Sequence, residues 1–219
     1  LCDENSTKVA KVTELIVKTA HKLGINFLDT APLYGQGESE RRIGLALNTL
    51  SEAHKREIVV NTKVGYRPDP FDYSYDATRI CVEKSLEILN MDRLQIVHIH
   101  DVERSDLDTV MNGARRALHE LQREGVVDHV GVSGGPVAVL HEFIETGEFD
   151  SVITHNRFNL LDQPARSLLE RARQLQMITI NAAPFATGLL ADPNRSRPTY
   201  GYQPANQSVI ERALKIETI

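Results

Sequence analysis

Six side chains that could bind a substrate or move a proton follow six apolar segments of the chain. They are Asp29, Lys63, His100, Ser133, His155 and Asn181. A carboxylate, an ammonium, two imidazoles, a hydroxyl and an amide are the groups that general acid–base catalysis uses. Taken singly, each has an ordinary structural reading, such as a turn cap or a solvated charge. Together, at consecutive segment ends, they predict one shared site.

The first two of these side chains are predicted to form an ion pair. If Asp29 and Lys63 end neighbouring strands, each reduces the cost of burying the other. Tyr34 lies five residues after Asp29, on the loop that leaves the same segment. An ammonium beside a phenol favours the phenolate, so the pKa of Tyr34 is expected well below its free value of about 10. Tyr34 would then donate and accept protons.

Two histidines close the third apolar segment, two positions apart. His100 is expected to hydrogen-bond a substrate oxygen and hold it near Tyr34. Because side chains alternate along a strand, His98 would point to the same side, one layer deeper. We interpret His98 as structural.

Short apolar segments alternate with segments of helical periodicity along the whole chain. Strands are expected at 25–28, 58–63, 94–100, 129–133, 151–155 and 178–183, and helices at 9–23, 39–50, 76–90, 109–124, 137–145, 163–176 and 208–215. The strand segments are too apolar to have a solvent face, which predicts a parallel sheet wrapped by helices.

Two architectures have such a sheet. An open dinucleotide-binding sheet should carry a G-x-G-x-x-G turn after its first strand, and the sequence has none there. The (β/α)8 TIM barrel, of fold class α/β, is therefore preferred. In that fold the chemistry gathers at the carboxyl ends of the strands.

The composition is that of a globular protein. With 41% hydrophobic and 25% charged residues, the 219 residues are expected to form a single domain, 1–219. A net charge of -5 gives no basic surface for nucleic acid or an anionic membrane. The two cysteines show no metal-ligand spacing, so no metal is expected and a cytoplasmic setting fits.

Four motifs resemble those of the aldo-keto reductases. They read "GINFLDTAPLYGQGESERRIGLAL", "VVNTKVG", "LQIVHIHDVE" and "VGVSG". The resemblance covers nearly the whole chain, from about residue 8 to 216. More narrowly, the chain resembles the aldose 1-dehydrogenase branch, which includes L-galactose, L-fucose and D-arabinose dehydrogenases.

This resemblance implies an oxidoreductase that depends on NAD or NADP. Asp29, Tyr34, Lys63 and His100 match the four catalytic residues of the family. Tyr34 would be the general acid or base, Lys63 would make it acidic, and Asp29 would hold Lys63. His100 would orient the substrate while hydride passes between nicotinamide C4 and the substrate carbon.

The resemblance also implies contacts to the cofactor. Ser133 matches the serine that binds the nicotinamide carboxamide, although Gly134 replaces the asparagine that often follows it. His155 stands where many members have a glutamine for the same group. Ala182 occupies the position of an aromatic residue that stacks on the nicotinamide, so that platform would be absent or supplied elsewhere.

One loop resembles the segment that packs along the cofactor pyrophosphate. It runs from Pro184 to Leu190, and the expected contacts are Pro184, Phe185, Gly188 and Leu189. Gly188 permits a close approach of the backbone, which makes an ordinary turn the weaker reading.

The family's strands 1 and 8 are apparently missing from the sequence. A full barrel has eight strands in about 250 residues, and this sequence supplies the family's strands 2 to 7. Because the expected catalytic residues are intact, we interpret the difference as omitted segments of a complete enzyme. The choice between NAD and NADP, which the family makes near its C-terminus, stays open.

Two loops are candidates for shaping a substrate pocket. Phe71, Tyr73 and Tyr75 could offer an apolar wall to a sugar or aldehyde, or could be structural. Arg195 and Arg197, within a predicted loop at 194–207, could bind an anion, although solvated surface charge is the favoured reading.

The leading functional hypothesis is an aldose 1-dehydrogenase that oxidises a sugar at C1 to its lactone. Two alternatives remain: an NADPH-dependent reductase of small aldehydes and ketones, and a non-catalytic subunit that retains the scaffold. The expected partner is a small sugar or aldehyde, with neither nucleic acid nor membrane, and the oligomeric state is open.

Overall fold

The computed structural model describes residues 4–65 and 71–218, with side chains from residue 11 onward. By their contacts these residues form two compact units. Unit 1 contains the described residues up to His100 together with Arg104–Gly131, and unit 2 contains Asp101–Glu103 and the described residues from Val132 onward. Each unit is described by itself, and a single domain over 1–219 stays a prediction.

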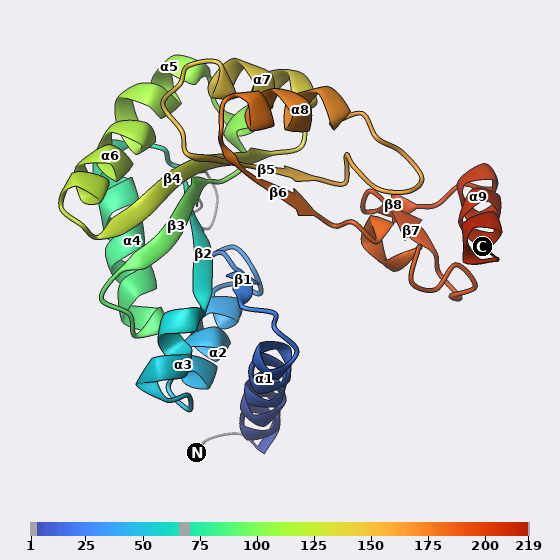
Figure 1. The fold of residues 1–219 in the computed structure, drawn as a ribbon, viewed down its shortest axis with the longest axis horizontal. Helices are drawn as coiled ribbons and strands as arrows, with labels where there is room; N and C mark the ends of the chain where they lie inside the picture. The colour runs from blue at the N-terminus through green and yellow to red at the C-terminus, as the bar shows by residue number, and fades with distance from the viewer. Residues whose placement is uncertain (1–3, 66–70, 219) are drawn as a thin grey trace. The chain divides into compact units, whose positions relative to one another are not determined.

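Strands and helices alternate along the chain, as the sequence predicts (Figure 1). The strands are β1 (Phe27–Asp29), β2 (Val59–Val64), β3 (Leu94–Ile99), β4 (Val127–Gly134), β5 (Ser151–His155), β6 (Ile178–Ala182), β7 (Thr199–Tyr200) and β8 (Gln203–Pro204). The helices are α1 (Glu4–Lys22), α2 (Glu38–Leu47), α3 (Glu52–Glu57), α4 (Tyr75–Leu89), α5 (Leu107–Val110), α6 (Arg116–Arg123), α7 (Val137–Ile144), α8 (Arg166–Gln174) and α9 (Gln207–Glu217).

The main sheet has six strands in the order of the sequence, β1-β2-β3-β4-β5-β6. The pairs β1/β2, β2/β3 and β5/β6 are parallel. Their register sets Asp29 opposite Asn61 and Lys63 opposite His98. Parallel neighbours that are joined by helical crossovers are the repeating unit of a (β/α)8 barrel.

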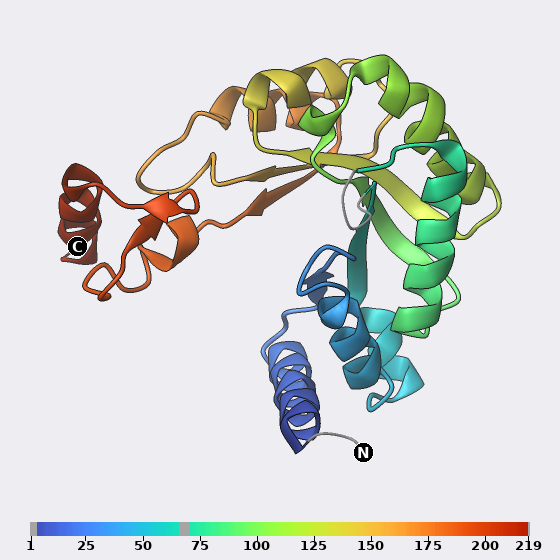
Figure 2. The same cartoon turned by 180° about the vertical axis from the view of Figure 1, so that it is seen from behind.

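Unit 1 covers β2 and β3 with helices that pack closely on one another (Figures 1 and 2). Ser74 caps the start of α4 by accepting from the backbone N–H of Ala77, and Asn90, with φ of 53°, ends that helix in the left-handed region. A side chain at Gly44 of α2 would place its Cβ 2.3 Å from the carbonyl oxygen of Ile88. Glycine there allows α2 and α4 to meet.

Unit 2 contains α7 against β5 and α8 against β6, with the two helices in contact (Figure 1). A separate small core follows β6. It is built from Leu161, Ala186, Leu189, Val209 and Ala213. α9 therefore packs on the loop that leaves β6, rather than being a free tail.

Three segments differ from the sequence prediction. The single helix expected at 109–124 is instead α5, a π-helical segment (Met111–Arg115) and α6. Gly113 lies in the π segment, where a Cβ would come within 2.1 Å of the Tyr73 carbonyl oxygen. The six residues of α3 are too few to show periodicity, and β7 and β8 form a small antiparallel pair inside the predicted loop.

Burial also differs at the ends of the sheet. Strands β2 to β5 are largely buried, as predicted, but β6 begins with two exposed residues, and β1 is only partly buried. A strand at the end of the sheet order has one neighbour and so keeps more solvent contact. In α1, Val17 is buried, whereas Val12 and Ile16 are exposed. Among the described helices, none combines the length and apolarity that a membrane crossing requires.

Candidate active site

The ion pair predicted from the sequence is present at the ends of β1 and β2. Lys63 Nζ lies 2.7 Å from Asp29 Oδ1 and donates to the carbonyl oxygen of Thr30 at 2.8 Å. The Lys63 side chain is only 2% exposed, whereas that of Asp29 is 29% exposed. A buried ammonium needs such partners because desolvation otherwise favours its neutral form.

Tyr34 and His100 lie beside this ion pair. Lys63 Nζ is 4.7 Å from the centre of the Tyr34 ring. The Tyr34 and His100 rings meet edge to face, with centroids 5.8 Å apart and an interplanar angle of 83°. Asp29, Tyr34, Lys63 and His100 are thus gathered within unit 1, on β1, β2, the loop after β1 and the residue after β3.

A polar layer beneath these residues includes one side chain that the sequence analysis missed. Asn61 Nδ2 donates to Asp29 Oδ1 at 2.5 Å, and His98 Nδ1 lies 2.6 Å from Asn61 Oδ1. Asn61 and His98 are both fully buried. Burial, together with the positive charge of Lys63, holds the pKa of His98 well below its usual range, so the imidazole is neutral. The alternation along β2 could have pointed to Asn61, two residues before Lys63.

The three aromatic residues of the loop after β2 separate into different roles. Tyr73 is buried, and its hydroxyl donates to the carbonyl oxygen of His100 at 2.7 Å. Phe71 stacks on Tyr73 and presents an edge to His100, with ring centroids 6.3 Å apart. Tyr75 instead hydrogen-bonds Glu120 of α6. Phe71 alone therefore keeps the geometry expected of a pocket wall.

The strand ends of unit 2 carry the other predicted side chains. Ser133 lies at the end of β4 and is 2% exposed. His155 ends β5 and is partly exposed, with Tyr202 6.4 Å away between ring centroids. Asn181 of β6 donates to the carbonyl oxygen of Phe158 at 2.8 Å. A hydroxyl, an imidazole and an amide are thus placed on three successive strands.

Two acidic residues that the sequence analysis missed lie near His155. His155 Nε2 is 4.0 Å from Asp101 Oδ1, and Glu103 accepts from the backbone N–H of Gly135 at 3.1 Å. One ligand atom from each of these three side chains falls within 4.8 Å of the others. Ligands of a tetrahedral metal stand about 3.4 Å apart at ordinary bond lengths. The cluster has the chemistry of a metal site but a wider spacing.

The expected cofactor contacts in the loop after β6 differ in how exposed they are. Pro184 and Phe185 are exposed, Phe185 by 63%. Leu189 is fully buried in the small core, so it offers no exposed surface for a cofactor contact. Gly188 has φ of 90°, and a Cβ there would lie 2.4 Å from Arg195 Nη1. Arg195 donates to the carbonyl oxygen of Thr187, which gives this arginine a structural partner.

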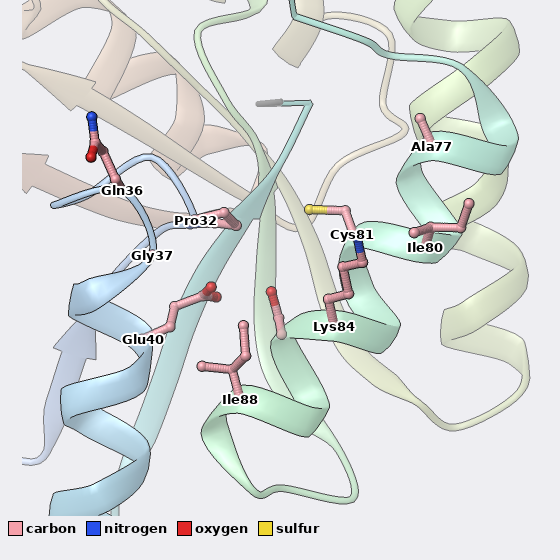
Figure 3. A pocket seen from close by; sticks show the side chains of 10 residues that line it. Pro32, Gln36, Gly37, Glu40, Ala77, Ile80, Cys81, Lys84 and Ile88 are labelled. Carbon is pink, nitrogen blue, oxygen red and sulfur yellow. The ribbon is translucent and has the colours of Figure 1, made fainter. Parts of the chain in front are cut away.

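A cavity of about 520 Å³ lies between α2 and α4 (Figure 3). Glu40 lines it from α2, and Cys81 and Ile88 line it from α4. Thr62 donates to Glu40 at 2.6 Å, and because Thr62 and Lys63 are successive residues of β2, their side chains point to opposite faces of the sheet. Burial raises the pKa of the Glu40 carboxyl, an effect that the hydrogen bond from Thr62 reduces. Tyr34 is not among the residues that line this cavity, although Pro32, Gln36 and Gly37 of the same loop are.

Comparison with known proteins shows the family to which the chain belongs. Residues 3–218 match the Aldo/keto reductase family. The chain is 32% identical to L-galactose dehydrogenase of Arabidopsis thaliana, 31% to D-threo-aldose 1-dehydrogenase of a Pseudomonas species and 33% to D-arabinose 1-dehydrogenase of Saccharomyces cerevisiae. These matches cover 80%, 93% and 91% of this chain, but only 56%, 69% and 61% of the relatives.

Solved structures agree on the fold. An aldo-keto reductase of Bacillus halodurans in its holo form matches 94% of this chain, and 66% of its own, with a TM-score of 0.76 at 24% identity. The glycerol dehydrogenase of Gluconobacter oxydans matches 98% of this chain, and 67% of its own, with a TM-score of 0.74 at 22% identity. The predicted (β/α)8 fold class is confirmed, with six of its parallel strands in the described residues.

Proposed function

Because the chain belongs to the aldo/keto reductase family, we propose that it is part of an aldose 1-dehydrogenase that uses NAD or NADP. In that reaction the sugar is oxidised at C1 to its lactone. The family membership supports an oxidoreductase, and the names of the sugar dehydrogenases that it resembles support the substrate class. The chain spans less than two thirds of two of these three relatives, so activity and substrate are proposals for the whole protein.

One observation carries this proposal. A buried ammonium, Lys63, is held by a carboxylate at 2.7 Å and lies 4.7 Å from the centre of the Tyr34 ring. Positive charge at that distance stabilises the phenolate relative to the phenol. A tyrosine so placed can exchange a proton with a substrate near neutral pH, which an ordinary tyrosine does poorly.

The four residues of unit 1 take distinct parts in the reaction. In sugar oxidation, the Tyr34 phenolate accepts the C1 hydroxyl proton as the carbon–oxygen bond becomes a carbonyl. Lys63 stabilises that phenolate, and Asp29 keeps Lys63 in place. His100, whose ring stands at 83° to that of Tyr34, orients the substrate oxygen. In the reverse direction, the Tyr34 phenol returns the proton.

The side chains of unit 2 fit a nicotinamide carboxamide. This group offers one carbonyl oxygen and one NH2, which pair with hydroxyl, imidazole and amide side chains. Ser133 and His155 supply the first two from successive strands, and they are the residues we propose for this contact. Ala182 has no ring that could stack on the nicotinamide. Tyr202 is 68% exposed, and its ring centroid lies 6.4 Å from that of His155, so unit 2 has an exposed aromatic ring beside His155. When bound, the nicotinamide supplies the hydride acceptor.

The remaining contacts belong to the loop after β6. We propose that Pro184, Phe185 and the backbone of Gly188 line the pyrophosphate, while Leu189, which is fully buried, holds this loop in the small core. Phe185 offers an exposed ring, and Gly188 offers a backbone without a side chain in a left-handed turn. The choice between NAD and NADP is part of what must be measured, as is the cytoplasmic setting that the cysteine count favours.

Initial rates decide among the alternatives. We expect the full chain to oxidise at least one of L-galactose, L-fucose and D-arabinose with NAD or NADP. Turnover of aldehydes with NADPH and of no sugar would instead support a general carbonyl reductase. A folded protein that binds nicotinamide nucleotides yet turns over neither substrate class would support a non-catalytic subunit.

A further inference from the structure

We propose that His98 and Asn61 form a fixed hydrogen-bond relay that orients the Asp29 carboxylate toward Lys63. Both are then positioning residues for the proton transfer. The role of the relay in proton transfer rests on the proposed function. Its hydrogen bonds lie within unit 1 and do not depend on that function. The relay involves two side chains that do not contact the Tyr34 ring in any described interaction.

The direction of the relay follows from the chemistry of its groups. An ionised carboxylate only accepts hydrogen bonds, so the Asn61 atom 2.5 Å from Asp29 Oδ1 is the NH2 group. The carbonyl oxygen of Asn61 then faces His98 Nδ1 at 2.6 Å and can only accept. His98 is neutral because burial lowers its pKa, so its one N–H must be on Nδ1.

Every member of the relay is fixed by its position in the sheet. Asn61 is opposite Asp29 on β1, and Lys63 of the same strand is opposite His98 on β3. Asn61 and His98 have no exposed surface, so solvent water does not compete for their hydrogen bonds. Turning the Asn61 amide over would set its oxygen against the Asp29 carboxylate, which costs a buried hydrogen bond.

Asp29 Oδ1 receives two donors, the Asn61 amide at 2.5 Å and the Lys63 ammonium at 2.7 Å. The amide therefore shares the negative charge of the carboxylate with the ammonium. Without the amide, the carboxylate is free to turn away, and Lys63 loses the partner that holds its ammonium beside Tyr34. The Tyr34 phenolate, 4.7 Å from Lys63 by its ring centre, then loses part of its electrostatic support.

The test measures the ionisation of Tyr34 directly. Ultraviolet difference titration of each protein against the same protein carrying Tyr34→Phe isolates this one phenol among six tyrosines. The titration needs neither cofactor nor substrate. The midpoint of the Tyr34 titration is the pH at which half of this phenol is ionised. We expect Asn61→Ala and His98→Leu each to raise this Tyr34 midpoint by about one pH unit. In the double variant the second change should add nothing, because both break one relay.

Matched variants separate the relay from general disturbance of the sheet. His98→Gln keeps a donor for the Asn61 oxygen and should restore most of the Tyr34 midpoint. Thr62→Val alters the same strand on its opposite face and should leave the midpoint in place. Midpoints unchanged in both Asn61→Ala and His98→Leu, or additive in the double variant, would overturn the relay.

Failure of the relay is distinguishable from failure of the proposed function. If the full chain oxidises sugars but the Tyr34 midpoint is unchanged in the Asn61 and His98 variants, the proposed function is supported and the relay is wrong. If the midpoint responds as expected while no sugar or aldehyde is turned over, the relay stands and the proposed function falls.

Discussion

The ammonium nitrogen of Lys63 lies 4.7 Å from the centre of the Tyr34 ring, although Lys63 belongs to β2, Tyr34 lies on the loop after β1, and the two are 29 positions apart in the sequence. Only 2% of the lysine side chain is exposed, so its charge acts with little screening by water. We therefore expect this charge to favour the phenolate of Tyr34 over the phenol.

Replacing Lys63 by methionine should remove that effect. Methionine keeps the apolar length of the side chain but not its charge, so the Tyr34 titration should return toward about 10 and sugar oxidation should fall steeply. Each pH unit of this shift corresponds to about 1.4 kcal/mol. Ultraviolet difference titration and steady-state rates measure both effects.

Lys84 provides the matched control for this change. Lys84 is an exposed lysine of α4 that lines the cavity between α2 and α4. Lys84→Met should leave both the Tyr34 titration and the rate near those of the unmodified protein. Equal losses in the two lysine variants would mean that the effect of Lys63 is not local.

Tyr34→Phe should separate proton transfer from cofactor binding. The change removes one hydroxyl and keeps the ring that meets His100 edge to face. We expect turnover to fall at least about a hundredfold, the usual contribution of general acid–base catalysis. Nucleotide affinity, followed by the fluorescence of the reduced nucleotide, should stay within about twofold. A variant that loses its fold instead would show that the phenol is a structural residue.

Glu40→Gln should change how stability depends on pH. Burial raises the pKa of Glu40 in the folded state above the ordinary glutamate value of 4.5, so above that pH the folded chain binds more protons than the unfolded chain. Stability is therefore lost as pH rises from that value through the raised pKa. The glutamine variant lacks this loss and should gain in relative stability between pH 4 and pH 8, as measured by urea unfolding. An identical pH dependence in both proteins would show that Glu40 is ionised without cost.

Gly44→Ala should destabilise the contact between α2 and α4. The added Cβ would lie 2.3 Å from the Ile88 carbonyl oxygen, a backbone atom that cannot move aside alone. Overpacking of this kind costs about 1 to 3 kcal/mol. Leu45→Ala, at an exposed position of the same helix, is the control and should cost less. Thermal unfolding followed by circular dichroism compares the two.

The sequence predicted the site of unit 1 because chemistry and periodicity agreed there. Apolar segments that end in Asp29, Lys63 and His100 require a parallel sheet, and a parallel sheet brings its carboxyl ends to one edge. The ion pair at 2.7 Å follows from that register. The proton-transfer role of Tyr34 was predicted from its place five residues after Asp29, and the resemblance added its match to the family's general acid or base.

The parts that the sequence did not predict depend on contacts between distant elements. In the sequence, Asn61 is a polar residue within an apolar strand, and nothing marks it as part of the site. Only the strand register, which sets Asn61 opposite Asp29, shows its place there. Glu40 looks like an exposed helix charge, yet it is buried against Thr62 of β2. The π segment at Met111–Arg115 passes close to the carbonyl oxygen of Tyr73, a contact that local propensity does not encode.

The pH dependence of sugar oxidation by the full chain tests the central claim most directly. Oxidation needs the phenolate of Tyr34, so kcat/KM should rise about tenfold per pH unit and level off well below pH 10, at the acidic midpoint that Lys63 creates. A rate that keeps rising to about pH 10, or the absence of any sugar turnover with NAD and with NADP, would contradict the account.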